Sequence, residues 1–212
     1  MVLYRENEQI ALCLDSQELG LPLVRLEIKH HHQPKDMYCV PTSMKMCLDF
    51  VCKKYKVRGL SVFSIKKIAK ITRTTVIDGT PPRAVEKINE HLLRARPSIS
   101  FVYREGSKFP EIDKELNKNC LPVIAYLNPK EKPQIERHYK LMHAVVLVEY
   151  DSLNHMVYYD DPEEDNEATA IQSLDVGTFN SLWEWERKWV QILLGEKQTN
   201  IQVFLEQEGV KK

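Results

Sequence analysis

One cysteine stands where a loop is predicted to enter a helix. Cys39 precedes Pro41, a residue tolerated in the first turn of a helix, and the apolar positions that follow recur every three or four residues up to Tyr55. The positive end of the helix dipole and the open N–H groups of the first turn favour a thiolate at such a position. Because thiolates are nucleophiles, Cys39 is the first candidate for covalent chemistry.

The other four cysteines are predicted to be inert. Cys47 and Cys52 fall on or beside the apolar face of the same helix, Cys13 lies in an expected strand, and Cys120 ends a helical turn. Filling of the core explains each of these four positions. Five scattered cysteines in a chain of 212 residues also favour a reducing compartment.

A nucleophilic cysteine needs a base and a group that orients the base. His143 opens a valine-rich strand, and Asp160 and Asp161 close the strand that returns beside it. In an antiparallel hairpin the loop length decides which residue stands opposite His143. A three-residue loop places Asp161 there, a two-residue loop places Asp160 there, and a four-residue loop places Pro162 there. The residues alone leave this register open.

Gln33 supplies a fourth candidate. It stands six residues before Cys39, close enough through a loop for its side-chain amide to donate to an oxyanion beside the backbone N–H of Cys39. Each residue also has an ordinary interpretation, as a solvated loop glutamine, a strand-edge histidine or an aspartate that caps a turn. The joint arrangement is far less expected by chance than any one member of it.

Helices followed by an antiparallel sheet are the elements expected to position these residues. The expected helices cover 41–55, 61–71, 84–93, 110–116 and 176–189, and the last of them contains Trp183, Trp185 and Trp189. The expected strands cover 98–103, 121–127, 143–150, 155–159 and 190–194. One or two more strands are expected within 1–28. This order predicts an α+β fold in which an N-terminal helical lobe packs on a C-terminal antiparallel sheet.

Length, composition and charge restrict the class of protein. A chain of 212 residues that is 43% hydrophobic fits a single globular domain over 1–212. Thirty Lys+Arg balance thirty Asp+Glu, so no positive field is available to hold nucleic acid. We find no export signal and no apolar run that could span a bilayer, and therefore expect a cytoplasmic protein without membrane insertion. The oligomeric state is not indicated.

Two polar runs could suggest a metal site. The histidines His30, His31 and His32 are consecutive, and side chains on an extended segment alternate between opposite faces, so all three cannot converge on one ion. The acidic run 160–167 lacks the glycine and the ligand spacing of a calcium loop. We expect solvated loops here, with no metal and no cofactor.

Three short runs carry a resemblance to a known family. They are Gln33-Pro-Lys-Asp-Met-Tyr-Cys39-Val-Pro41, His143-Ala-Val-Val-Leu-Val and Tyr159-Asp160-Asp161-Pro162. Together they resemble the double-glycine (bacteriocin-processing) leader peptidases and their stand-alone relatives in the papain-like clan, over residues 30–190. The resemblance implies an α+β fold of the papain-like cysteine peptidases.

The resemblance also implies a role for each candidate. Cys39 would be the nucleophile, His143 the general base and acid, Asp161 the carboxylate that orients it, and Gln33 the oxyanion donor. The Asp-Pro step of the family selects Asp161 over Asp160. The implied substrate is a peptide or protein, cleaved at a peptide or amide bond.

Two other functions fit the same residues. One is an acyl or peptidyl transferase that uses the same Cys, His and Asp. The other is a catalytically silent peptide-binding module, which is favoured by Val40 because the family commonly has glycine at that position. Substrate specificity is expected in loops 72–82 and 128–140.

Overall fold

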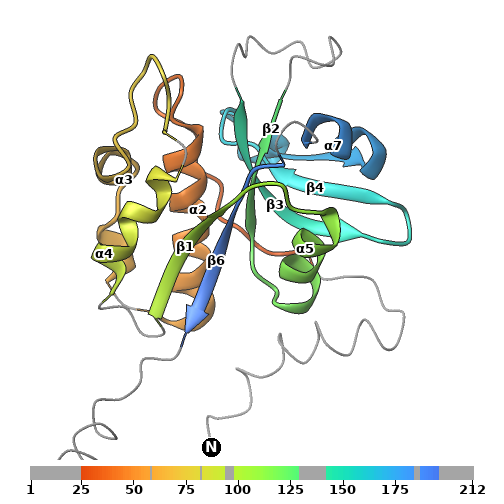
Figure 1. Ribbon diagram of the computed structural model, residues 1–212, viewed down its shortest axis with the longest axis horizontal. Coiled ribbons are helices and arrows are strands. Elements are labelled where there is room, and N and C mark those ends of the chain that lie inside the picture. Colours follow the sequence, from red (N-terminus) through yellow and green to blue (C-terminus); the bar gives the residue numbers. More distant parts are fainter. Residues whose placement is uncertain are drawn as a thin grey trace, which may run out of the picture.

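A computed structural model describes residues 25–57, 59–81, 83–93, 98–128, 142–183 and 187–195. Its centre is a six-stranded sheet with the order β1-β6-β2-β3-β4-β5, in which every neighbouring pair is antiparallel (Figure 1). The strands are β1 (Ser98–Arg104), β2 (Val123–Leu127), β3 (His143–Asp151), β4 (Met156–Asp160), β5 (Ile171–Asp175) and β6 (Trp189–Gly195). The strands expected before residue 25, and Cys13, lie outside the described residues.

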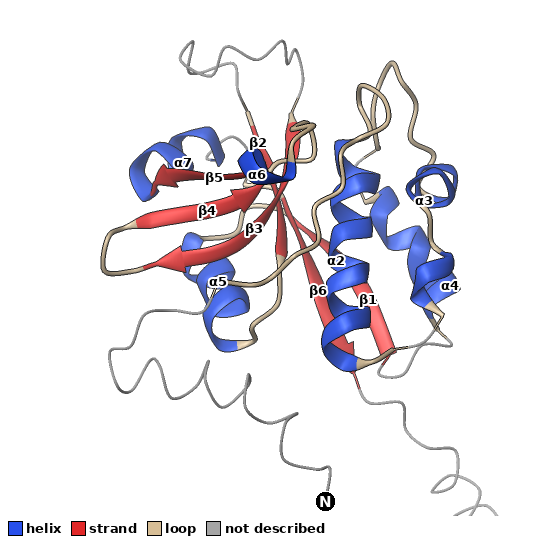
Figure 2. Ribbon diagram, turned by 180° about the vertical axis from the view of Figure 1, so that it is seen from behind, coloured by secondary structure: helices blue, strands red, loops and turns tan. Residues whose placement is uncertain are grey.

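Helices flank this sheet in two groups. They are α2 (Cys39–Tyr55), α3 (Ile65–Ile71), α4 (Asn89–Leu92), α5 (Phe109–Asp113), α6 (Glu167–Ala170) and α7 (Val176–Trp183), with 3-10 turns at Leu60–Val62 and Ala84–Ile88 and a π-turn at Lys114–Lys118. The helices α2, α3 and α4 gather beside β1 and β6, whereas α5 and α7 lie near the β3–β4 hairpin (Figures 1 and 2). The described helices include none that is long and apolar enough to cross a membrane.

The helix α2 packs along the sheet and fixes the position of its first residue. Met44, Cys47, Leu48 and Val51 are fully buried on it, as are the residues at the start of β3. Burial of one such side chain contributes about 1.5–3 kcal/mol. The hydroxyl of Ser43 also donates to the backbone carbonyl of Ala144 at 3.4 Å. The N-terminal turn of α2 is therefore held against the start of β3.

The loop of the β3–β4 hairpin differs from the loops considered above. β3 extends to Asp151, which pairs with Met156, so that the loop consists of Ser152–His155. The Asp151 side chain accepts hydrogen bonds from the backbone N–H groups of Leu153 and Asn154, each at 3.0 Å. Aspartate favours such a turn, and the loop therefore starts at Ser152, one residue later in the chain than the predicted loops.

A bulge changes the register a second time. The pairing shifts between Leu147 and Glu149, and Asp160, the last residue of β4, stands opposite Val146. His143 pairs with Leu127 of β2 but lies beyond the end of the pairing between β3 and β4. None of the three simple registers is correct, because each assumed an uninterrupted ladder.

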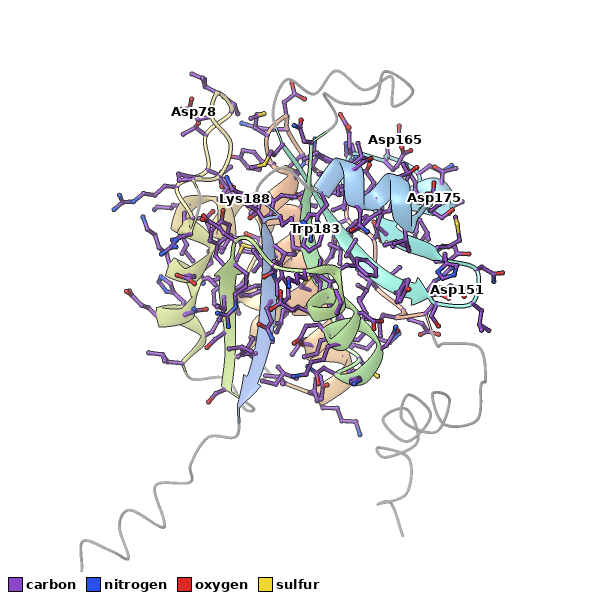
Figure 3. All side chains as sticks on the ribbon, turned by 45° about the vertical axis from the view of Figure 1, so that its right-hand side comes forward. Asp78, Asp151, Asp165, Asp175, Trp183 and Lys188 are labelled. Carbon is purple, nitrogen blue, oxygen red and sulfur yellow. The ribbon has the colours of Figure 1, made fainter. Side chains whose placement is uncertain are left out.

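The C-terminal part of the chain differs most from the predicted elements. The helix expected over 176–189 ends at Trp183, and Trp189 lies instead in β6, opposite Ala125. Trp185 lies outside the described residues. The indole N–H of Trp183 donates to the carbonyl of Lys188 at 3.0 Å, which holds the chain as it enters β6 (Figure 3). Neither α6 nor β5 was predicted, whereas the earlier elements are found with shifted ends.

The cysteines behave largely as predicted, with one exception. Cys47 and Cys52 are free. Cys120 is buried in the core, as predicted, but it is disulfide-bonded, which was not predicted. The cysteines therefore no longer favour a reducing compartment.

Candidate active site

Cys39 is the first residue of α2. The first helical hydrogen bond runs from the N–H of Thr42 to the carbonyl of Tyr38, at 3.1 Å. A helix leaves the N–H groups of its first turn without partners inside the helix, and Pro41 has none. The backbone N–H groups of Cys39 and Val40 are thus the donors that this end of the helix presents. The Val40 side chain, 4% exposed, packs in the hydrophobic core.

The structure brings Cys39 and His143 together. His143 is the first residue of β3, and its side chain makes a hydrogen bond with that of Cys39. Both residues are buried, with 9% of Cys39 and 5% of His143 exposed. The contact joins the start of a helix in the first half of the chain to the start of a strand in the second half.

Asp161 holds the other side of the histidine ring. Nε2 of His143 lies 2.7 Å from Oδ1 of Asp161, which is also buried. Asp161 is itself fixed, because Oδ1 accepts from the N–H of Glu163 at 2.9 Å and its own N–H donates to Ala170 at 3.0 Å. With Nε2 engaged by the carboxylate, Nδ1 is the ring nitrogen left to face the thiol.

These contacts change the charge of His143. Burial alone lowers the pKa of His143, but hydrogen bonds with Asp161 and Cys39, and the charges of both, raise it from 6.5 to about 9. The imidazolium form is therefore favoured at neutral pH. The protonated ring lies beside the sulfur and can donate a proton to a group that approaches it.

Gln33 approaches the same region from the N-terminal side. Its side chain is buried, and its backbone N–H donates to the carbonyl of Pro162, the residue after Asp161, at 2.7 Å. Its side-chain Oε1 has no hydrogen-bond partner within the described part of the chain. The predicted oxyanion donor and the predicted orienting carboxylate are thus carried by two segments that are bonded to each other.

Asp160 makes its side-chain hydrogen bond with a different histidine, His30. Its Oδ1 lies 2.7 Å from Nδ1 of His30, and it makes no contact of this kind with His143 among the described residues. Burial raises the pKa of Asp160, and the opposing effect of the neighbouring His30 is smaller. The alternative in which Asp160 orients His143 is therefore wrong for this structure.

One further acidic residue lies close to the site. Among the described residues, His143, Asp161 and Glu163 offer ligand atoms that all lie within 4.8 Å of one another. Two of these three residues, His143 and Asp161, are hydrogen-bonded to each other. Glu163 was not predicted as a neighbour of His143, although its position two residues after Asp161 indicated that it could lie near the ring.

Of the two loops expected to set specificity, one can be placed. A Cβ atom on Gly79 would lie 3.2 Å from Cε of Met37, two residues before Cys39 in the chain. The loop after α3 therefore reaches the segment that leads into the candidate nucleophile. Residues 129–141, nearly all of the second loop, lie outside the described residues.

The fold and this arrangement define a class of protein. The model of the Peptidase_C39-like family matches residues 24–189, most of the chain, and the chain belongs to that family. Its fold is the papain-like α+β fold, as predicted.

Two solved structures are similar. A Bacillus anthracis protein assigned to the C39-like peptidases aligns with a TM-score of 0.60 at 17% identity, over 83% of this chain and 99% of that one. A double-glycine motif protease from an AMS/PCAT transporter, solved in complex with the leader peptide, aligns with a TM-score of 0.49 at 16% identity, over 81% of this chain and 96% of that one. No curated protein matches the chain.

Proposed function

We propose that the chain is a cysteine peptidase that cleaves a peptide or amide bond of a peptide or protein substrate. Membership of a family named for peptidases supports the general class. The observation that carries the finer proposal is the position of the His143 ring, hydrogen-bonded with Cys39 and with Asp161. This is the contact pattern that a cysteine nucleophile, its base and an orienting carboxylate require.

In the first half of the reaction Cys39 becomes acylated. The thiolate sulfur forms a bond with the substrate carbonyl carbon, and the carbonyl oxygen becomes an anion that accepts from the N–H of Cys39 and the amide of Gln33. The C–N bond then breaks while His143 gives its proton to the leaving nitrogen. The products of this half are a free amine and a thioester on Cys39.

Water completes the cycle. Neutral His143 takes a proton from water, whose oxygen attacks the thioester carbonyl. The C–S bond breaks, the acid leaves, and the thiolate and imidazolium pair is restored. An amine in place of water would give the transferase reaction with the same residues.

Two reagents test the proposal without knowledge of the natural substrate. Iodoacetamide reports a reactive thiolate, and p-nitrophenyl acetate reports acylation through the release of p-nitrophenolate. We expect Cys39→Ala to abolish both reactions at mildly acidic pH. Cys47→Ala is the matched control and should leave both reactions unchanged. Burial, and to a smaller extent the charge of Asp160, raise the pKa of the Cys47 thiol and keep it protonated.

The alternatives give distinct results. Alkylation of Cys39 without acylation would favour a silent binding module. Mass analysis of the products of an acylated peptide, with and without an added amine, separates transfer from hydrolysis. Equal labelling of Cys39→Ala and Cys47→Ala would contradict the assignment of the nucleophile.

A further inference from the structure

The run of three histidines has a structural arrangement that the proposed reaction does not use. In the structure their side chains alternate along an extended segment. His30 and His32 both reach the carbonyl of Glu164, whereas Nε2 of His31 lies 2.7 Å from Asp49 on α2. This alternation was expected from the extended backbone. The solvated loops expected for the two polar runs are wrong for His30 and Asp160, whose side chains are buried against each other. Of the three, His30 is held on both sides of its ring.

His30 makes two hydrogen bonds in a buried setting. Nδ1 lies 2.7 Å from Oδ1 of Asp160, and Nε2 lies 2.9 Å from the carbonyl oxygen of Glu164. The side chains of His30 and Asp160 are only 7% and 1% exposed. Both ring nitrogens of His30 are therefore engaged by the segment that carries Asp160 and Glu164.

The two partners of His30 bracket the candidate carboxylate Asp161. Asp160 precedes Asp161 directly, and Glu164 donates its N–H to the backbone carbonyl of Asp161 at 3.1 Å. We call the three-way contact of His30 with Asp160 and Glu164 the histidine clamp. It fixes the turn that carries Asp161 by contacts that do not involve His143.

Gln33 lies at the other end of the short segment 30–33, which begins with His30. Its backbone N–H donates to the carbonyl of Pro162 at 2.7 Å, within the turn that the histidine clamp holds. The side chain of Gln33 is buried, and such a side chain can be aimed only as accurately as its backbone is held. Among the described contacts, release of His30 would leave this backbone hydrogen bond and the contact of the exposed His32 with the carbonyl of Glu164, at 3.1 Å, and the buried contact with Asp160 would be lost.

We propose that His30 is a positioning residue that holds Gln33 for oxyanion stabilisation. The inference rests on the proposed function, since Gln33 has this task only if Cys39 attacks a carbonyl. The histidine clamp acts through Gln33 and not through the thiol. It should therefore affect reactions that pass through an oxyanion and spare those that do not.

Two reagents separate these effects. Iodoacetamide alkylates the thiolate by displacement, in which a C–S bond forms, the C–I bond breaks and iodide leaves without an oxyanion. Acylation by p-nitrophenyl acetate forms a tetrahedral oxyanion before the C–O bond breaks and p-nitrophenolate leaves. Loss of one oxyanion donor typically lowers a rate by about 10²–10³-fold, so a displaced donor should cost about tenfold or more.

We expect His30→Ala to lower the rate of acylation at least about tenfold while the rate of alkylation stays within about twofold. Gln33→Ala should show the same selective loss. His30→Asn retains a side-chain donor at the position of Nδ1 and should recover part of the acylation rate. His91→Ala, at an exposed histidine of α4, is the matched control and should change neither rate.

The proposal is overturned if His30→Ala lowers both rates in parallel, since that indicates a general role in folding, or if it changes neither rate. Should His30→Ala fail to fold, the ratio of the two rates in His30→Asn decides in the same way. Failure of the proposed function looks different. In that case the wild-type protein is alkylated but not acylated, or Cys39→Ala is still acylated.

Discussion

The charge of Asp161 should set the protonation of His143. Asp161→Asn keeps a side-chain oxygen that can accept from Nε2 of His143 but removes the negative charge. In the wild-type protein the hydrogen bond that His143 donates to Asp161 is the largest of the effects that raise the pKa of His143 against burial. We therefore expect the pKa of His143 to fall in this variant.

The size of the fall can be estimated from the structure. A pKa raised from 6.5 to about 9 corresponds to about 3 kcal/mol of preference for the imidazolium. If Asp161 supplies half or more of this preference, its neutralisation lowers the pKa of His143 to about 8 or below. Burial continues to oppose the charged form and acts in the same direction.

The imidazole C2–H resonance of His143, followed by NMR from pH 5 to 10, measures this pKa directly. His143→Ala assigns the signal by its absence among the seven histidines. Asp165→Asn is the matched control, because Asp165 is an exposed carboxylate close to Asp161 in the chain (Figure 3). It should leave the midpoint unchanged.

Two results would contradict a pKa of His143 that is raised by the charge of Asp161. One is a wild-type midpoint near 6.5, which would mean that burial outweighs the two partners. The other is a midpoint near 9 that persists in Asp161→Asn, which would show that the carboxylate charge is not the cause.

The same raised pKa predicts how stability depends on pH. Stabilisation from protonated His143 is fully present below pH 6.5 and is lost as pH rises through about 9. The free energy of unfolding should therefore fall by about 2–3 kcal/mol between these two pH values. In His143→Gln it should fall much less. Urea unfolding at both pH values measures this, and equal losses in the two proteins would contradict it. At α3, the side chain of Ser64 accepts from the N–H of Lys67 at 3.2 Å, so Ser64→Ala should lower the unfolding free energy by about 1 kcal/mol. The exposed Ser61→Ala is its control, and a loss of the same size there would refute the capping role.

The sequence was informative where one face of an element is buried. The apolar spacing of α2 predicted that helix to within two residues at its start, because its buried face repeats with the helical period. It was uninformative at the C-terminal end. There Trp189 continues an apolar pattern like that of α7 but pairs with Ala125 in β6, and periodicity does not reveal pairing with a distant strand.

Among the candidate residues, the Asp161 contact was predicted for an incomplete reason. A simple ladder with a three-residue loop placed Asp161 opposite His143, but the longer β3 and the bulge at Leu147–Glu149 move the register away from that pairing. Asp161 reaches the ring from the turn after β4, where its side chain and backbone are held by hydrogen bonds. Bulges and side-chain turns depend on contacts between segments, which a single sequence does not show.

Two consecutive aspartates could serve two histidines because neighbouring side chains at a strand end point to opposite sides. Asp160, the last residue of β4, turns to His30, and Asp161, the next residue, turns to His143. One short turn thereby holds both the base of the proposed reaction and the segment that carries Gln33. Exchange of either aspartate for asparagine should thus have separable effects. Asp161→Asn should lower the pKa of His143, whereas Asp160→Asn should impair acylation and leave that pKa near 9. If both variants shifted His143 equally, the two histidine–aspartate pairs would have to be regarded as one electrostatic unit.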